Sequence, residues 1–503
     1  MAIPAPDSNP ASSGRALEKR AFVLVAALAL VVALGAIGTR GLYETTEGRF
    51  AEVAREMLES GNWLEPQVAY RPHYDKPPLS YWAMAAGMSV FGVGELGVRA
   101  GTGLAFVLSA LGVAWLGALL WDRRTGLVAG LVYATSAFPA IASGSLASDG
   151  FVTLFEIGAM LAYVHATRSR ERRTERRWVV VVWFALGLAF LAKGTAGLLP
   201  LAPILLFDAA SGRRMRMASP VGLVVFGAVG LGWYVLVVWR NDGLLSFLID
   251  QQITGRLFRD EYNRNPQWYK PFTMYLPLVA FGTAPWIFVA GRGLWAARRS
   301  LLPRALRAPS PALLLAAWIV PPLVVFSLAR SRLPLYVLPL AAPVALAVAR
   351  ALARSHGDKA LRRAVAFAVP TALVLAAVLA ASGWIDHPND MRALARFVRA
   401  EAPTGRVYAY EEDALHGLRF YLGGDLTRLS GSDEAYADRP LEAAIRELSL
   451  ASETSALVTK PRRAAALRSL LEKNGLDVAE RSERGWSLLL AAPARHAADA
   501  GAP

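Results

Sequence analysis

The sequence contains no cysteine, and that absence removes several kinds of chemistry. Without cysteine the protein has no disulfide, no thiolate metal site and no cysteine nucleophile. We also find no Rossmann fingerprint, the glycine-rich turn that binds a dinucleotide. Charged residues make up only 18% of the chain. These absences exclude a thiol-based enzyme and argue against a nucleotide site of the Rossmann type.

Hydrophobic residues, in contrast, make up 54% of the 503 residues, and the mean hydropathy is +0.35. They form long Leu-, Ala- and Val-rich runs without alternation between Ala21 and Ser382. A helix crosses a bilayer with about 20 mostly apolar residues, and only helices or closed barrels span lipid. We therefore predict an all-α polytopic membrane protein with about eleven or more transmembrane helices. The predicted spans lie near residues 21–38, 100–121, 124–142, 149–167, 178–192, 195–208, 218–239, 272–291, 310–329, 333–352 and 363–382.

The formal net charge of +15 is concentrated in short connections between these runs. Because loops rich in lysine and arginine stay in the cytoplasm, this charge indicates membrane topology and not nucleic-acid binding. If successive connections lie on opposite sides of the membrane, all eleven spans agree with an N-terminus in the cytoplasm and a C-terminal segment outside. The basic connections are 122–124, 168–177, 213–216, 298–307 and 350–363.

This topology divides the chain into four parts. Residues 1–20 are predicted to be a disordered cytoplasmic tail, and the first apolar run is a retained helix and not a cleaved signal peptide. The membrane domain covers 21–383 with a large outer loop at 39–99, in which Arg49–Ser60 is amphipathic and Leu79–Phe91 is interfacial. A periplasmic α/β domain follows at 384–496, with a tail at 497–503. Its expected strands are 407–410 and 456–459, and its expected helices are 393–401 and 463–474.

Unusual polar residues gather at the outer face of the predicted membrane domain. Charged groups at the end of a span usually face a cavity or a partner, and acids beside cations suit an anionic substrate. The residues concerned are Glu47, Arg49, Asp75, Lys76, Asp149, Lys193, Arg256, Arg332 and Tyr336.

Five of these residues also have a structural explanation. Glu47 can pair with charges on its own helix, and Asp149 can cap the helix that it begins. Lys193 can extend to lipid headgroups, and Arg256 can be a solvated loop charge. Tyr336 can anchor a span at the interface.

The order of short motifs resembles that of bacterial lipid-linked-sugar glycosyltransferases. The matching segments are Tyr43-Glu44-Thr45-Thr46-Glu47-Gly48-Arg49-Phe50-Ala51-Glu52, Tyr74-Asp75-Lys76-Pro77-Pro78-Leu79, Gly97-Val98-Arg99-Ala100, Ser148-Asp149, Ala192-Lys193-Gly194 and Ser331-Arg332-Leu333-Pro334-Leu335-Tyr336. They resemble those of the lipid A 4-amino-4-deoxy-L-arabinose transferases and, more distantly, the protein O-mannosyltransferases. The resemblance covers about residues 25–350, and the C-terminal domain agrees in position only.

This resemblance implies a GT-C fold and a polyprenyl-phosphate sugar donor. The acceptor would be an envelope lipid or glycan such as lipid A, and transfer would invert the sugar at the periplasmic face of the bacterial inner membrane. Glu47 and Asp149 match acids of the active site. Lys76, Lys193, Arg256 and Tyr336 match the donor-phosphate contacts, and Arg49, Asp75 and Arg332 are further substrate-binding candidates. Relatives carry an acidic pair where this chain has Thr46-Glu47, so Glu47 must replace the missing acid or the base lies elsewhere.

Other functions are compatible with parts of the same pattern. A transporter or flippase would place polar groups near mid-membrane, often with inverted repeats, and we detect no repeat. A ligase or polymerase of O-antigen also uses lipid-linked sugars, but the acid-Lys-Pro motif argues against it. A catalytically silent homologue is favoured by Thr46. We expect no required cofactor and leave open a divalent metal, for which His73 beside Asp75 is the only hint.

Overall fold

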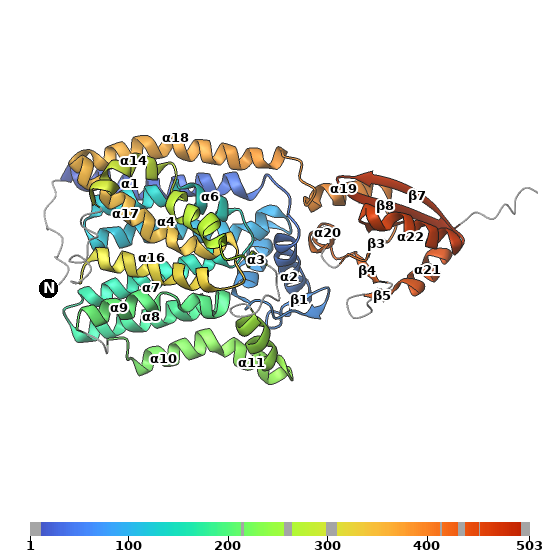
Figure 1. Ribbon diagram of the computed structural model, residues 1–503, viewed down its shortest axis with the longest axis horizontal. Helices are drawn as coiled ribbons and strands as arrows, with labels where there is room; N and C mark the ends of the chain where they lie inside the picture. The colour runs from blue at the N-terminus through green and yellow to red at the C-terminus, as the bar shows by residue number, and fades with distance from the viewer. Residues whose placement is uncertain are drawn as a thin grey trace, which may run out of the picture.

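The computed structural model describes residues 12–212, 216–255, 264–297, 309–412, 415–430, 438–451 and 453–493. Figure 1 shows a long bundle of helices that is joined at one end to a smaller α/β region. The first helix, α1 (Ser12–Ile37), begins inside the segment 1–20 that we predicted to be disordered. Residues 1–11 and the predicted tail 497–503 lie outside the described residues, as do 494–496 of the predicted periplasmic domain.

Small residues allow the helices of the bundle to approach one another closely. A Cβ atom at Gly126 would lie 2.3 Å from the carbonyl oxygen of Ala114, so α4 and α5 touch through their backbones. The bundle consists of α1, α4 (Glu95–Leu120), α5 (Arg123–Ala134), α6 (Ala137–Ser143), α7 (Asp149–Arg168), α8 (Arg172–Lys193), α9 (Leu201–Ala210), α10 (Pro220–Phe226), α11 (Gly232–Arg240), α12 (Leu244–Phe247), α13 (Leu276–Phe281), α14 (Trp286–Ala297), α16 (Pro311–Leu328), α17 (Ala341–His356) and α18 (Ala360–Ala381).

Shorter 3-10 and π-helical pieces interrupt or extend these helices, as η1 (Gly194–Leu198), η2 (Gly227–Leu231), η3 (Leu248–Gly255), η4 (Pro271–Tyr275) and η6 (Pro334–Leu340) do. Among the described residues, six helical segments are long and apolar enough to cross a membrane, or up to eight if each of two bent pairs counts as one span. The bends are 58° between α5 and α6 and 89° between α13 and α14. The predicted number of eleven spans is therefore not confirmed, although most of the predicted spans coincide with helices.

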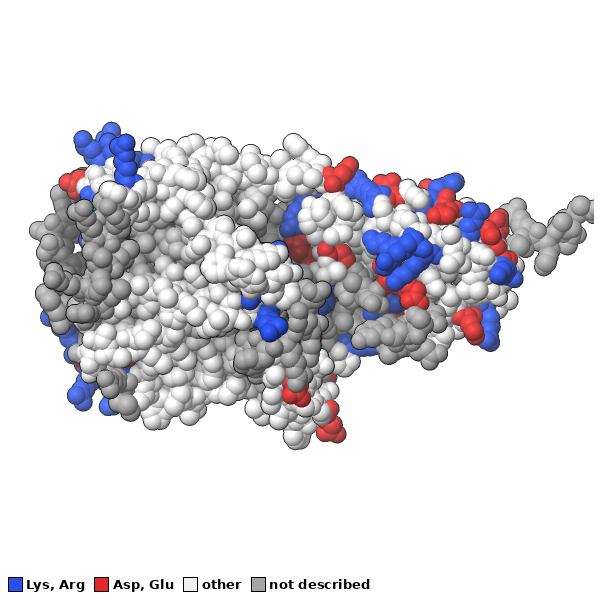
Figure 2. Space-filling view, in the orientation of Figure 1, with Lys and Arg blue, Asp and Glu red and all other residues white. Residues whose placement is uncertain are grey.

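The basic connections meet at one end of the bundle. Arg124 pairs with Asp358 at 2.6 Å, and the backbone oxygen of Leu119 accepts a hydrogen bond from Arg168. These contacts join the α4–α5, α7–α8 and α17–α18 connections. Figure 2 shows lysine and arginine at this end and a broad surface with almost none between it and the α/β region. The predicted basic segments 213–215 and 298–307 lie outside the described residues.

The outer loop forms two helices and a hairpin at the other end of the bundle. Its amphipathic stretch is α2 (Thr46–Ser60), followed by β1 (Gln67–Val68), β2 (Arg71–Pro72) and α3 (Leu79–Phe91). Helix α3 buries Tyr81 and Met84 and exposes Val90 and Phe91. Helix α2 is buried along most of its length, because α3, β1 and α20 pack against it.

The α/β region is built on a six-stranded mixed sheet in the order β5-β4-β3-β6-β8-β7. Strands β3 (Val407–Tyr410), β4 (Thr427–Ser430), β5 (Arg439–Pro440) and β6 (Ser455–Thr459) are parallel, and β7 (Leu476–Glu483) and β8 (Trp486–Pro493) are antiparallel. Its helices are α19 (Met391–Glu401), α20 (His416–Tyr421), α21 (Leu441–Leu450) and α22 (Pro461–Lys473). The four elements that we predicted correspond to β3, β6, α19 and α22.

Candidate active site

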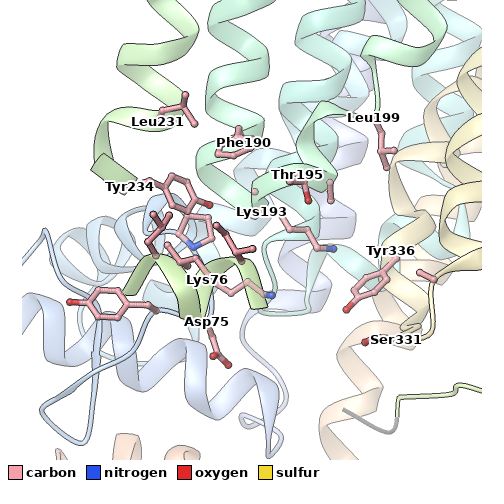
Figure 3. Close-up of a pocket in the computed structure, with 18 of the residues that line it drawn as sticks. Asp75, Lys76, Phe190, Lys193, Thr195, Leu199, Leu231, Tyr234, Ser331 and Tyr336 are labelled. Carbon is pink, nitrogen blue, oxygen red and sulfur yellow. The ribbon is translucent and has the colours of Figure 1, made fainter. Parts of the chain in front are cut away.

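A cavity of about 550 Å³ lies at the end of the bundle that faces the α/β region. Its walls come from the loop before α3, from the junction of α8 and η1, from α11 to η3, and from α16 to η6 (Figure 3). Its polar lining residues are Tyr74, Asp75, Lys76, Lys193, Thr195, Tyr234, Ser331 and Tyr336. The remaining lining is apolar and includes Phe190, Leu199, Leu231, Val235, Val238, Leu245, Leu248, Ile249, Val325 and Phe326.

Lys193 is placed in this cavity by the end of α8. Gly194 follows it with φ +67°, a left-handed conformation that ends the helix and suits glycine. The Lys193 ammonium lies 4.1 Å from the centroid of the Tyr336 ring and forms an ion pair with Asp149. Its side chain is only 10% exposed, so it does not extend to lipid headgroups. Figure 3 shows Lys193 and Lys76 directed toward the space beside Tyr336.

Asp149 begins α7 and is buried, with 9% of its side chain exposed. Its carboxylate accepts a hydrogen bond from Lys193. The N-cap position of α7 is held by Ser148, without a side-chain cap bond, so Asp149 is the first helical residue and not the cap. Asp149 therefore joins the cavity through its ion pair with Lys193.

Asp75 connects the cavity to the outer loop. Its Oδ2 lies 3.4 Å from Nη1 of Arg49 and 3.9 Å from Nε2 of His73. Burial lowers the pKa of His73 to about 4, so this imidazole is neutral at neutral pH. Among the described residues, no group of three His, Asp or Glu side chains could hold a metal ion, so the residues around Asp75 do not fit one.

Glu47 lies outside this lining and is held by two arginines. Its oxygens accept hydrogen bonds of 2.6 Å from Arg40 and 3.1 Å from Arg99, and also bonds from the backbone N–H groups of Tyr43 and Leu146. Burial alone would raise the pKa of Glu47, but the charge of Arg99 and the hydrogen bonds from Arg40 hold it below its ordinary value. This environment favours a structural anion over a proton acceptor.

Arg332 is buried and binds backbone carbonyl groups near the cavity, but it does not line the cavity. Its guanidinium donates to the carbonyl oxygens of Asn265, Gln267 and Ser327 at 2.9 to 3.0 Å. The predicted phosphate contact Arg256 lies outside the described residues. Of the predicted site residues, Asp75, Lys76, Lys193 and Tyr336 thus line one cavity, and Asp149 pairs with one of them.

Sequence reasoning missed several polar groups that line the cavity or hold a predicted site residue. Arg40 and Arg99 hold Glu47, and Thr195, Tyr234 and Ser331 line the cavity. Arg99 could have been selected from the sequence, because it lies in Gly97-Val98-Arg99-Ala100, one of the segments that carry the family resemblance. Tyr234 had no such signal, because an isolated Tyr near a span end is typical of an interfacial anchor.

Comparison with known proteins gives a consistent result for this region. Residues 75–239 match the family model described as dolichyl-phosphate-mannose-protein mannosyltransferase. An undecaprenyl phosphate-alpha-4-amino-4-deoxy-L-arabinose arabinosyl transferase of Pectobacterium carotovorum is 32% identical over 341 residues, which are 65% of this chain and 58% of the relative. The enzyme of the same name from Pseudomonas aeruginosa is 32% identical over 318 residues, 61% of this chain and 55% of the relative. The chain thus matches less than two thirds of the length of these relatives.

Two solved structures share the fold. ArnT from Cupriavidus metallidurans bound to undecaprenyl phosphate aligns with a TM-score of 0.79 at 21% identity, over 98% of this chain and 100% of that one. The archaeal oligosaccharyltransferase AglB from Archaeoglobus fulgidus, in complex with an inhibitory peptide and a dolichol-phosphate, aligns with a TM-score of 0.54 at 14% identity, over 96% and 75%. These findings confirm the resemblance to GT-C lipid-linked-sugar glycosyltransferases, and the fold is of the GT-C ArnT type.

Proposed function

We propose that this protein is a membrane glycosyltransferase that moves a sugar from a polyprenyl-phosphate carrier to an envelope acceptor such as lipid A. The reaction would take place at the periplasmic face of the bacterial inner membrane, and the N-terminus would lie in the cytoplasm. The observation that carries the proposal is the meeting of Lys76, Lys193 and Tyr336 in one mostly apolar cavity.

Both halves of such a donor suit this cavity. Its apolar walls, including Leu245, Leu248 and Ile249, can pack against a prenyl chain. Two lysines and a tyrosine hydroxyl can hold the phosphate through hydrogen bonds that charge strengthens. All of these groups lie at the end of the bundle next to the α/β region and not halfway along it, which favours a transferase over a carrier.

The chain's residues also suit displacement at the anomeric carbon. The acceptor oxygen would attack from the face opposite the phosphate, the bond from the anomeric carbon to the phosphate oxygen would break, and its electron pair would remain on that oxygen. Lys76 and Lys193 would stabilise the resulting charge. A hydroxyl acceptor would give its proton to Asp149, whereas a phosphate acceptor is already anionic and Asp149 would then orient the sugar.

The names of the relatives identify a donor to be tested first, undecaprenyl phosphate-α-4-amino-4-deoxy-L-arabinose. The purified protein in lipid vesicles would receive this donor in radiolabelled form together with lipid A. We expect transfer to lipid A by the wild type, and a loss of about a hundredfold in rate for K76A, K193A and D149A, because each removes a charged group that acts on the reacting atoms. Y336F should lose only about fivefold, since one hydrogen bond disappears.

K473A is the matched control, because Lys473 lies on an exposed position of α22 in the α/β region. It should transfer sugar at the wild-type rate. Undiminished transfer by K76A, K193A and D149A would overturn the site. Absence of transfer from any polyprenyl-phosphate sugar by the wild type would overturn the proposed function.

A further inference from the structure

We infer that the Ser331 hydroxyl is a further contact of the carrier phosphate, an inference that rests on the proposed function. Ser331 lies between α16 and η6 and lines the cavity together with Lys193 and Tyr336. Figure 3 shows its oxygen on the same side of the cavity as the Tyr336 hydroxyl. This residue is not among those that we predicted to contact the phosphate.

The Ser331 side chain is almost completely enclosed, but its hydroxyl lacks a partner. The residue is 6% exposed, and within the described residues its Oγ forms no hydrogen bond. The lining residues shortly before it in the chain, Val325, Phe326 and Ala329, have apolar side chains. Buried hydroxyls in native proteins are nearly always hydrogen-bonded, and an exception needs an explanation. A ligand atom in the cavity would supply the missing partner.

The backbone next to Ser331 is fixed by Arg332. The N–H group of Arg332 donates to the carbonyl oxygen of Arg264 at 2.8 Å. The Asn265 side-chain amide donates to the carbonyl oxygen of Arg332 at 3.0 Å, and the Arg332 guanidinium donates in return to the carbonyl oxygen of Asn265 at 3.0 Å. Arg332 therefore positions Ser331 at the cavity wall, and a group that is already fixed loses little freedom when a ligand binds.

An anionic oxygen is the partner that suits the groups around Ser331. Lys76 and Lys193 point toward the space beside Tyr336 (Figure 3), and the Lys193 ammonium lies 4.1 Å from the centroid of the Tyr336 ring. An anion held there accepts hydrogen bonds, and a serine hydroxyl can donate one. Hydrogen bonds to a charged oxygen are stronger than those between neutral groups. We therefore expect Ser331 to donate to a phosphate oxygen of the carrier.

The test measures the binding of undecaprenyl phosphate, a carrier without a sugar, to the full chain in lipid nanodiscs. S331A should bind it about tenfold more weakly than the wild type, because one hydrogen bond to a charged group is lost. Undecaprenol has the same prenyl chain and no phosphate. It should bind equally to S331A and to the wild type, since the hydroxyl of Ser331 then has no charged partner.

The thermal midpoint without carrier separates this role from a structural one. S331A removes a buried hydroxyl that has no partner within the described residues, so its midpoint should be no lower than that of the wild type. S143A is the matched control, because Ser143 is 3% exposed and its hydroxyl donates to the carbonyl oxygen of Ala140 at 2.7 Å. It should melt at a lower temperature and bind undecaprenyl phosphate as the wild type does.

The outcomes distinguish this inference from the proposed function. Wild-type affinity of S331A for undecaprenyl phosphate, or a lowered midpoint, would overturn the role of Ser331, while weaker binding by K193A would leave the proposed function intact. A loss of sugar transfer by S331A with unchanged phosphate binding would assign Ser331 to the sugar and would also overturn the inference. If the wild type bound undecaprenyl phosphate no more tightly than undecaprenol, the proposed function itself would be wrong.

Discussion

Glu47 is fixed by Arg40, by Arg99 and by the backbone N–H groups of Tyr43 and Leu146. Arg40 and Tyr43 lie in the segment just before α2, Arg99 lies on α4, and Leu146 lies in the turn before α7. The carboxylate therefore ties the start of the outer loop to α4 and to that turn. The sequence predicts a catalytic role for this residue. Its surroundings favour a structural role, and the two roles lead to different results on mutation.

We expect E47Q to lower the free energy of unfolding by about 3–5 kcal/mol, because the buried arginines lose the charge that compensates them. The measurement is the thermal midpoint of the purified protein in detergent. The lowered pKa of Glu47 means that its stabilisation is present above the ordinary carboxyl pKa and is lost as the pH falls through the folded value. The difference between wild type and E47Q should therefore shrink in acid.

E59Q is the control for this prediction, since Glu59 lies on the same helix and pairs with Arg55 while half exposed. Removing its charge should cost at most about 1 kcal/mol. If E47Q kept the wild-type midpoint and lost only its transfer rate, Glu47 would be a catalytic residue after all.

At the residue scale, sequence could identify cavity groups that stand in short motifs. Lys76 and Lys193 were selected because their motifs match and because charges at span ends face cavities, and both line the cavity. The ion pair of Asp149 with Lys193 was not predictable, because it depends on how α7 and α8 pack.

Helix α2 is the element that joins the bundle to the α/β region. Just before it, the Glu44 carboxylate accepts hydrogen bonds from the backbone N–H groups of His416 and Gly417 at 3.1 and 2.7 Å. Burial raises the pKa of Glu44 from 4.5 to about 8, although these bonds oppose the change. Burial also raises the pKa of Glu56, which accepts from the backbone of Ala69 and Tyr70, to about 7.

These two acids predict that the thermal midpoint falls as the pH rises from about 5 to 8. An acid whose pKa is higher in the folded state holds an extra proton there, so folding becomes less favourable until the pH passes the folded value, by up to about 1.4 kcal/mol per pH unit for each group. Differential scanning fluorimetry across this range would show the slope. E44Q should reduce it, and Glu56 should account for what remains.

The matched control is E442Q, because Glu442 is an exposed acid on α21. It should leave the slope unchanged. A slope equal to that of the wild type in E44Q, or a midpoint that rises with pH, would contradict the account of this junction.

At the element scale, apolar runs and amphipathic periods were sufficient for α2, β3, β6, α19 and α22. They were not sufficient for β7, because its alternation is limited to buried Leu476 and Val478 on either side of exposed Asp477, and the rest of the strand is partly or fully exposed. They also failed to show where helices bend. The hydroxyls of Thr135 and Ser136 bond back to carbonyl oxygens of α5 at the break before α6, a local competition that hydropathy does not register.

At the scale of the whole molecule, two ends of opposite character explain most of the sequence pattern. The basic connections meet at one end, and the cavity and the α/β region occupy the other (Figures 1 and 2). The sequence could predict this division, because the side of each connection follows from its charge and from its order along the chain. The number of spans could not be predicted in the same way. An apolar run can form a bent pair of helices or a short helix such as α9 in place of one straight span.

The central claim is that Lys76, Lys193 and Tyr336 hold the phosphate of a prenyl carrier in one cavity. A cryo-EM structure of the full chain in lipid nanodiscs with undecaprenyl phosphate tests it most directly. The account predicts a phosphate within hydrogen-bond distance of both Nζ atoms, with the prenyl chain against Leu245, Leu248 and Ile249. A phosphate bound away from these lysines, or a prenyl chain running through the bundle toward the basic end, would contradict it.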